Sequence, residues 1–114
     1  MNTLDDNQAA SPSAGAATIP SRAVLEIDAA NHPGVMSHVV SLFSRRAYNV
    51  EGILCLPVGD GRRSRIWLQV NEDIRLQQMM RQIEKLEDVS GVRRHPAGHA
   101  VFGGLGEFFQ PMQE

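Results

Sequence analysis

The segment Asn31-His32-Pro33-Gly34-Val35-Met36 has the residue types of a site that could hold a small anion. It lies where an extended apolar run gives way to a helical pattern. The first backbone N–H groups of a helix have no partner within it, and the helix dipole adds positive charge there, so this turn could bind a carboxylate. A glycine lets a ligand approach the backbone closely. Any strand-to-helix turn can share these features, so plain architecture remains an alternative.

A second polar segment starts the next extended stretch of the chain, at Tyr48. It runs from Tyr48 to Ile53 and includes the amide of Asn49 and a glycine at position 52. The two segments together suggest a small-molecule sensor rather than an enzyme.

Other reactive residues do not combine into a catalytic or metal-binding pattern. His95 and His99 have a spacing found in zinc sites, but Pro96 prevents a helix through them and the chain has a single cysteine. Cys55 lies in an extended stretch without an evident base or electropositive pocket. The glycine-rich segment 59–61 precedes a strand, whereas a phosphate-binding loop precedes a helix. We therefore expect no catalytic residue and no metal site in this chain.

The bulk composition fits one small intracellular domain. The chain has 114 residues, 11 basic and 13 acidic side chains and a formal net charge of −2, which gives no electrostatic reason to expect nucleic acid or an anionic membrane as a partner. No apolar run approaches the roughly 20 residues of a membrane helix, and the N-terminus lacks the pattern of a secretory signal. A single cysteine fits a reducing compartment. These features predict a cytoplasmic protein.

Apolar periodicity predicts four strands and two helices in the order β-α-β-β-α-β. The strands are expected over residues 22–30, 49–56 (closed by Pro57), 64–70 and 92–95, and the helices over 34–47 and 73–87. This order is that of the ferredoxin-like α+β fold, with a four-stranded antiparallel sheet and both helices on one face. It assigns residues 22–96 to one domain. Residues 1–21 are rich in Ala, Ser, Asn, Asp and Pro and are expected to form a disordered tail.

The alternation of apolar residues also predicts which side of the sheet each strand residue faces. The helix-covered face is expected to hold Leu25, Ile27, Ile66, Leu68 and Val70. The open face is expected to carry Val24, Ile53, Cys55 and Trp67 among polar residues, which would make it a candidate partner surface. The C-terminal tail, residues 97–114, holds three of the four phenylalanines. It could add a strand, dock on a partner protein or remain loose.

Four stretches of the chain resemble the small regulatory subunit of bacterial acetohydroxyacid synthase (acetolactate synthase), in the short single-domain form of isozyme I. They are residues 31–39 (NHPGVMSHV), 42–57 (LFSRRAYNVEGILCLP), 66–71 (IWLQVN) and 82–89 (QIEKLEDV). The resemblance covers about residues 23–94. It implies an ACT domain, which is a ferredoxin-like module that binds amino acids.

What is known of that family sets further expectations. Two domains pair side by side into one eight-stranded sheet, and valine, the feedback inhibitor, binds where helix one of one protomer meets strand two of the other. The small subunit raises the activity of the catalytic large subunit and confers inhibition. Thiamine diphosphate, magnesium and FAD are expected on the large subunit, and no cofactor is expected on this chain. The alternative is a free-standing ACT-domain sensor, or an adaptor for another enzyme.

Turn chemistry and resemblance together give a specific hypothesis for the effector site. The ligand carboxylate would accept hydrogen bonds from the N–H groups of Gly34, Val35 and Met36. Asn31, or Asn49 of the neighbouring protomer, would orient the carboxylate or the ammonium group. Val35, Val50 and Ile53 would form the apolar pocket for a branched side chain, and His32 and Pro33 complete the predicted set.

Overall fold

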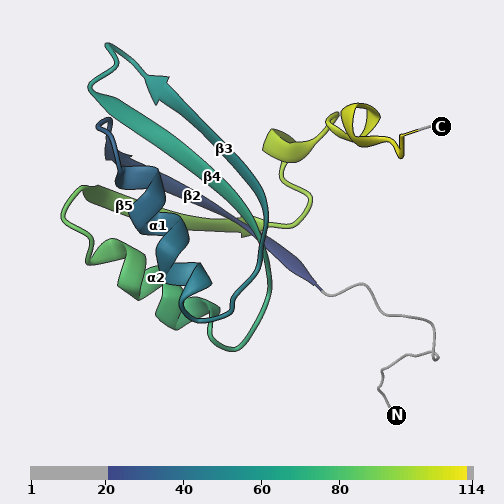
Figure 1. Ribbon diagram of the computed structural model, residues 1–114, viewed down its shortest axis with the longest axis horizontal. Helices are drawn as coiled ribbons and strands as arrows, with labels where there is room; N and C mark the ends of the chain where they lie inside the picture. The colour runs from purple at the N-terminus through teal and green to yellow at the C-terminus, as the bar shows by residue number, and fades with distance from the viewer. Residues whose placement is uncertain (1–20, 113–114) are drawn as a thin grey trace.

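Strands and helices follow one another in the predicted order β-α-β-β-α-β, and two short 3-10 helices come after them (Figure 1). The computed structural model describes residues 21–112, so the prediction for the N-terminal tail lies outside the described residues except at Ser21. The elements are β2 (Arg22–Ala30), α1 (Val35–Ser44), β3 (Val50–Val58), β4 (Arg63–Asn71), α2 (Leu76–Glu84), β5 (Val89–Pro96), η1 (Ala100–Phe102) and η2 (Gly106–Phe109).

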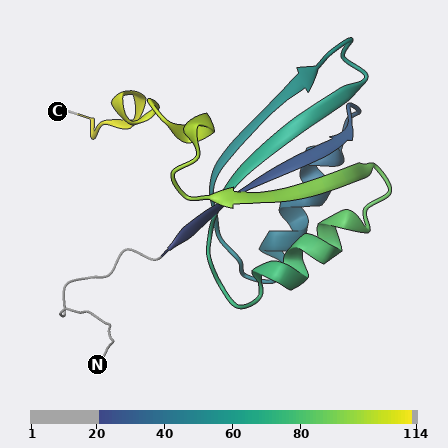
Figure 2. The same ribbon diagram turned by 180° about the vertical axis from the view of Figure 1, so that it is seen from behind.

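The four strands form one antiparallel sheet in the order β3-β4-β2-β5. Both helices cover the same face, which leaves the other face open (Figures 1 and 2). This arrangement confirms the predicted ferredoxin-like α+β fold. It leaves β3 and β5 as the two edge strands.

The hydrophobic core lies between the sheet and the two helices. The five residues predicted for the helix-covered face are all fully buried: Leu25, Ile27, Ile66, Leu68 and Val70. Helix α1 adds Val35, Val39, Leu42 and Phe43, and α2 adds Leu76, Met79 and Ile83. Residues three and four apart lie on one side of a helix, so each helix presents a single apolar stripe to the sheet. No helix in residues 21–112 has both the length and the apolar character needed to cross a membrane.

Strand β3 differs from the prediction because it contains a bulge. Val50 lies opposite Val70 and Gly52 lies opposite Gln69, so Glu51 is an extra residue and the register shifts there. Beyond the bulge, Ile53 lies opposite Leu68, a core residue of β4. An inserted residue reverses the alternation of faces, and a simple alternating pattern does not reveal it.

The bulge makes the predicted placement of Ile53 and Cys55 on the open face wrong. Cys55 lies opposite Ile66 and packs against the core, and Ile53 lies on the same side of the strand. Val24 and Trp67 do lie on the open face, as predicted. Leu54 and Leu56 replace the two mispredicted residues there, because they lie opposite Trp67 and Arg65.

Several elements end at other residues than the periodicity indicates. Pro57 does not close β3 but pairs with Ser64 inside it, which a proline can do on an edge strand. Helix α1 ends at Ser44, before Ala47 turns into a left-handed conformation with φ of 53°. Helix α2 is also shorter than predicted, while β5 begins at Val89 rather than Val92.

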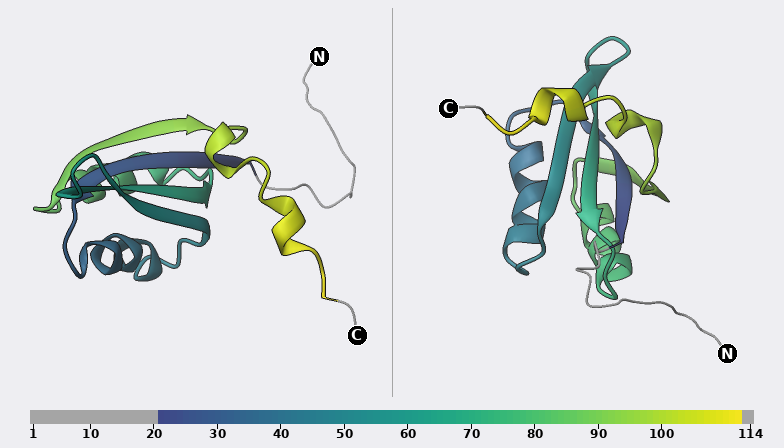
Figure 3. Two further views of the ribbon diagram at one scale, coloured as in Figure 1. Left: turned by 90° about the horizontal axis from the view of Figure 1, so that it is seen from above. Right: turned by 90° about the vertical axis from the view of Figure 1, so that its right-hand side faces the viewer.

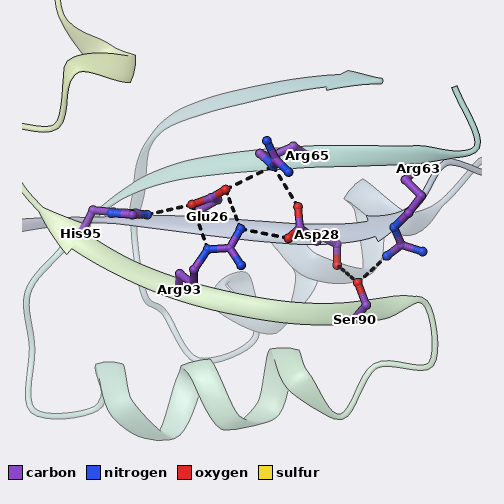
Figure 4. Close-up of polar contacts among 7 residues, drawn as sticks. All are labelled: Glu26, Asp28, Arg63, Arg65, Ser90, Arg93 and His95. Carbon is purple, nitrogen blue, oxygen red and sulfur yellow. Dashed lines mark hydrogen bonds and ion pairs between the residues drawn. The ribbon is translucent and has the colours of Figure 1, made fainter. Parts of the chain in front are cut away.

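The open face carries a cluster of charged side chains that joins β4, β2 and β5 (Figure 4). Glu26 on β2 is only 8% exposed. Its carboxylate accepts two hydrogen bonds from Arg93, at 3.1 and 2.7 Å, and a third contact at 2.8 Å comes from His95 on β5. Arg65 on β4 lies 3.2 Å from Glu26 and 2.8 Å from Asp28. We call these five residues the charge cluster.

The C-terminal arm, which we define as residues 97–112, forms η1 and η2 and no strand. Its first part rests on the open face. The ring of His99 stacks on Trp67 with centroids 4.8 Å apart, and a methyl group at Gly52 would lie 3.0 Å from the ring of Phe102. Of the predicted alternatives for this segment, an added strand is therefore not formed within the described residues.

Candidate effector site

The two predicted halves of the site lie at opposite ends of α1. The turn from Asn31 to Met36 leads into the N-terminus of the helix, whereas Asn49, Val50 and Ile53 lie beyond its C-terminus. A helix of 10 residues is about 15 Å long. One amino acid is much shorter than that, so it cannot contact both halves within a single protomer.

The turn before α1 presents bare backbone at the start of the helix. Gly34 precedes the first helical residue with φ of 94° and ψ of −15°, and no side chain caps the helix. A Cβ atom at Gly34 would meet nothing within 4 Å. The N–H of Val35 donates to the carbonyl of His32 at 3.4 Å, so one of the three predicted donors is already engaged. This leaves the N–H groups of Gly34 and Met36 as the donors that the predicted anion cradle would use.

Asn31 and His32 fix this turn to neighbouring loops. The side-chain amide of Asn31 donates to the carbonyl of Gly61 at 2.7 Å, and its backbone N–H donates to Arg62 at 3.0 Å. The turn is therefore tied to the β3–β4 hairpin. One amide hydrogen and the side-chain oxygen of Asn31 stay available for a ligand.

Both ring nitrogens of His32 are engaged, at 2.7 Å from the Pro33 carbonyl and 2.7 Å from the Asp88 carboxylate. Both partners are acceptors, so they favour the doubly protonated ring. The Pro33 carbonyl first, and then Asp88, raise the pKa of His32 above its ordinary value of 6.5. A raised pKa means that this contact holds the turn most firmly at low pH and weakens as the pH rises through the raised value. His32 thus positions the turn, which its place in the sequence did not reveal.

The second half of the site is a shallow, open hollow of about 410 Å³ at the C-terminal end of α1. It brings together three predicted residues, Asn49, Val50 and Ile53. Sequence reasoning missed four other lining residues: Val40, Ser44, Ala47 and Tyr48. Val40 and Ser44 could have been identified from the sequence, because they lie one helical turn apart and outside the buried stripe of α1.

Tyr48 holds the start of β3 in place. Its hydroxyl donates to the carbonyl of Asn71, and its ring packs edge-on against Phe43 with centroids 5.4 Å apart. The guanidinium of Arg75 lies 4.8 Å from the ring centroid. Burial, together with Asp73, raises the pKa of the Tyr48 hydroxyl, so it stays a neutral donor. Next to it, the amide of Asn49 donates to the carboxylate of Glu51.

Val35 does not line this hollow, because its side chain is 5% exposed and packs into the core at the other end of α1. Met36 is partly buried against the same core. Of the three apolar residues predicted for the pocket, only Val50, which is half-buried, and Ile53, which is 43% exposed, therefore present accessible surface to this hollow.

A family model and a curated relative that match this chain describe the same kind of protein. Residues 25–91 match a protein-family model described as the AHAS small subunit-like ACT domain. The chain is 56% identical over 87 residues to the acetolactate synthase isozyme 1 small subunit of Escherichia coli K12, a match that spans 76% of this chain and 91% of that protein.

Solved structures agree on the fold. The acetolactate synthase small subunit from Thermotoga maritima superposes with a TM-score of 0.58 and 30% identity, over 64% of this chain and 46% of that one. The ACT domain from GTP pyrophosphokinase of Chlorobium tepidum gives a TM-score of 0.55 at 20% identity, over 68% of this chain and all of that domain. The second likeness speaks for the fold alone.

Proposed function

This chain belongs to the family of acetohydroxyacid synthase small subunit-like ACT domains, and we propose that it is a valine-sensing regulatory subunit of acetolactate synthase. The observation that carries the proposal is the division of the effector site between the two ends of α1. Each protomer offers an anion-binding turn at one end and an apolar, amide-bearing hollow at the other. Such a site becomes complete only when a second copy supplies the other half.

Pairing of two copies along β3 would join the two halves. The turn at Asn31 is bonded to Gly61 and Arg62, so it lies at the same end of the sheet as the hairpin that joins β3 to β4. A two-fold axis perpendicular to the sheet makes the two β3 strands antiparallel and keeps all helices on one face. The start of β3 in one copy, with Asn49 and Val50, then lies beside the turn of the other.

The ligand chemistry follows from these groups. The carboxylate of valine accepts hydrogen bonds from the N–H groups of Gly34 and Met36 at the positive end of α1. The ammonium group donates to the side-chain oxygen of Asn31 or of Asn49 across the interface. The branched side chain packs on Val50 and Ile53, whose apolar surface is accessible.

Regulation requires that ligand binding changes the catalytic subunit. Valine bound between two protomers favours one dimer arrangement over others, and the catalytic subunit responds if it also binds those arrangements unequally. Couplings of this kind are about 1–3 kcal/mol, which is roughly a 5- to 150-fold effect. We place thiamine diphosphate, magnesium and FAD on that catalytic subunit and the complex in the cytoplasm.

Valine is expected to stabilise the folded dimer. At about 100 times its dissociation constant, a ligand that binds only the native state adds about 2.7 kcal/mol, which for a domain of this size raises the melting temperature by roughly 10 °C or more. Thermal unfolding with L-valine, L-leucine and L-isoleucine measures this, and D-valine serves as the control of equal composition. An unchanged melting temperature with all three L-amino acids would contradict the sensor. Co-purification with a catalytic subunit separates a regulatory subunit from a free-standing sensor.

A further inference from the structure

We propose that the C-terminal arm is a dimer clasp: its η2 segment crosses the β3 edge, and Phe108 and Phe109 pack on Leu56 of a second copy of this chain. The inference rests on the β3 pairing in the proposed function. It assigns a role to a segment outside the residues matched by the ACT-domain model, which end at 91.

The root of the arm is fixed to the open face by side-chain contacts. The ring of His99 packs against both Trp67 and His95, with centroids 4.8 and 4.6 Å away. Its Nδ1 accepts the N–H of Val101 at 3.0 Å and so caps η1. The Phe102 ring then occupies the space over Gly52, where an added Cβ would lie 3.0 Å from it, closer than ordinary van der Waals contact. These contacts fix where the arm meets β3.

The tip of the arm, by contrast, is largely uncovered. Leu105 and Phe109 border a hollow of about 310 Å³ together with β3 residues 51–54. Phe109 is nevertheless 78% exposed and Phe108 is 72% exposed. In both views of Figure 3 the arm leaves β5 and extends away from the end of the sheet at which β3 begins. Because Leu105 and Phe109 border residues 51–54 of β3, a strand that pairs with this part of the β3 edge meets the arm.

The exposed apolar side chains point to the same place. Six large apolar residues are exposed among residues 21–112, and they are Ile53, Leu56, Ile74, Phe108, Phe109 and Met112. All except Ile74 lie on β3 or on the arm. Leu56 is 71% exposed and lies opposite Arg65, which puts it on the open face, the same face as the arm. An unpaired edge strand flanked by apolar surface is a site of strand addition.

In an antiparallel pair of β3 strands, Phe108 and Phe109 on the arm of one copy come close to Leu56 of the other copy. Strand β3 runs from Val50 to Val58, so Leu54 is its midpoint. With the two-fold axis at that midpoint, Gly52 of one copy lies opposite Leu56 of the other, and both positions are on the open face. The arm crosses its own strand at Gly52 and continues past the edge. It therefore arrives over Leu56 of the second copy, and the symmetry repeats the contact twice in the dimer.

Dimer dissociation of the full chain tests the clasp. Sedimentation equilibrium over a dilution series gives the dimer dissociation constant of the wild type, of Phe108→Ser/Phe109→Ser and of Leu56→Ser. We expect each variant to raise the constant at least about tenfold, because central aromatic contacts dominate interface energies. Ile74→Ser is the matched control: it also removes one exposed apolar side chain, away from β3, and is expected to leave the constant unchanged.

Combining the substitutions tests contact rather than mere loss of apolar surface. The triple variant combines Leu56→Ser with Phe108→Ser/Phe109→Ser. If Phe108 and Phe109 pack on Leu56, its dimer dissociation constant is no more than about twice that of the Phe108→Ser/Phe109→Ser variant, because the effects of substitutions at residues in contact are not additive. Independent, multiplicative effects would overturn the assigned contact. A chain ending after Gly104 removes the tip but keeps η1, and it serves if the serine variants fold poorly by circular dichroism.

The remaining outcomes separate the clasp from the proposed function. A wild type that stays monomeric at every concentration rejects the β3 pairing and the clasp with it. A wild-type dimer whose constant is unchanged in the arm variants rejects the clasp alone. Arm variants that keep the dimer constant but lose binding to the catalytic subunit of the source organism show that the arm docks there, which also overturns the clasp.

Discussion

Replacement of Gly34 by aspartate is expected to weaken valine binding by at least about 100-fold. The new carboxylate stands at the start of α1, where the proposed ligand carboxylate lies, so like charges meet and the N–H donors are already satisfied. A side chain at Gly34 meets open space, so the fold survives. The positive φ of 94° costs about 1 kcal/mol for a residue other than glycine.

Gly34→Asn is the matched control, because asparagine has the same shape and the same backbone strain but no charge. We expect this variant to keep valine affinity within about tenfold of the wild type, because it has no charge to repel the ligand carboxylate. The steric penalty is the same for both substitutions, so any further loss in the aspartate variant comes from its charge. Isothermal titration calorimetry with L-valine measures the two variants side by side. Equal affinity for the aspartate and asparagine variants would show that the ligand carboxylate does not lie at this helix terminus.

The second large effect concerns the charge cluster and acid. The hydrogen bonds from Arg93, opposed in part by burial, lower the pKa of Glu26 from 4.5 to about 2. A lowered pKa means that the cluster stabilises the fold above pH 4.5 and loses this contribution as the pH falls toward 2. A pKa lowered by that much corresponds to a contribution of roughly 3 kcal/mol to the free energy of unfolding. Solvent screening at the partly exposed Arg65 and Arg93 reduces this contribution to about 1–2 kcal/mol.

Urea unfolding of the wild type and of Glu26→Gln at several pH values isolates this contribution. At pH 7 the variant is expected to be less stable by about 1–3 kcal/mol, because Arg65 and Arg93 lose a buried partner. The difference should shrink by about 1–2 kcal/mol between pH 5 and pH 2.5. Glu84→Gln, on the exposed side of α2, is the control with the same chemical change. A Glu26 difference that is constant with pH would contradict the role of its charge.

Much of the fold was predictable because it depends on local periodicity. Strand β2 spans the predicted residues, and the five core residues predicted for the helix-covered face are all buried. The errors occur where a single residue changes the pattern. One extra residue at Glu51 moves Ile53 and Cys55 to the helix face, and an edge position allows Pro57 inside a strand. Neither event leaves a clear signal in alternation.

The order of elements, the two polar segments and the resemblance to a regulatory family can be recognised from the chain alone, because they depend on residues close together in it. How distant residues combine depends on the folded structure. In the fold, the two segments lie at opposite ends of α1, and the two ring nitrogens of His32 contact Pro33 and Asp88. Glu26, Arg65 and Arg93 come together on the open face. Side chains from different strands become neighbours only through strand register, which depends on pairing between segments far apart along the chain.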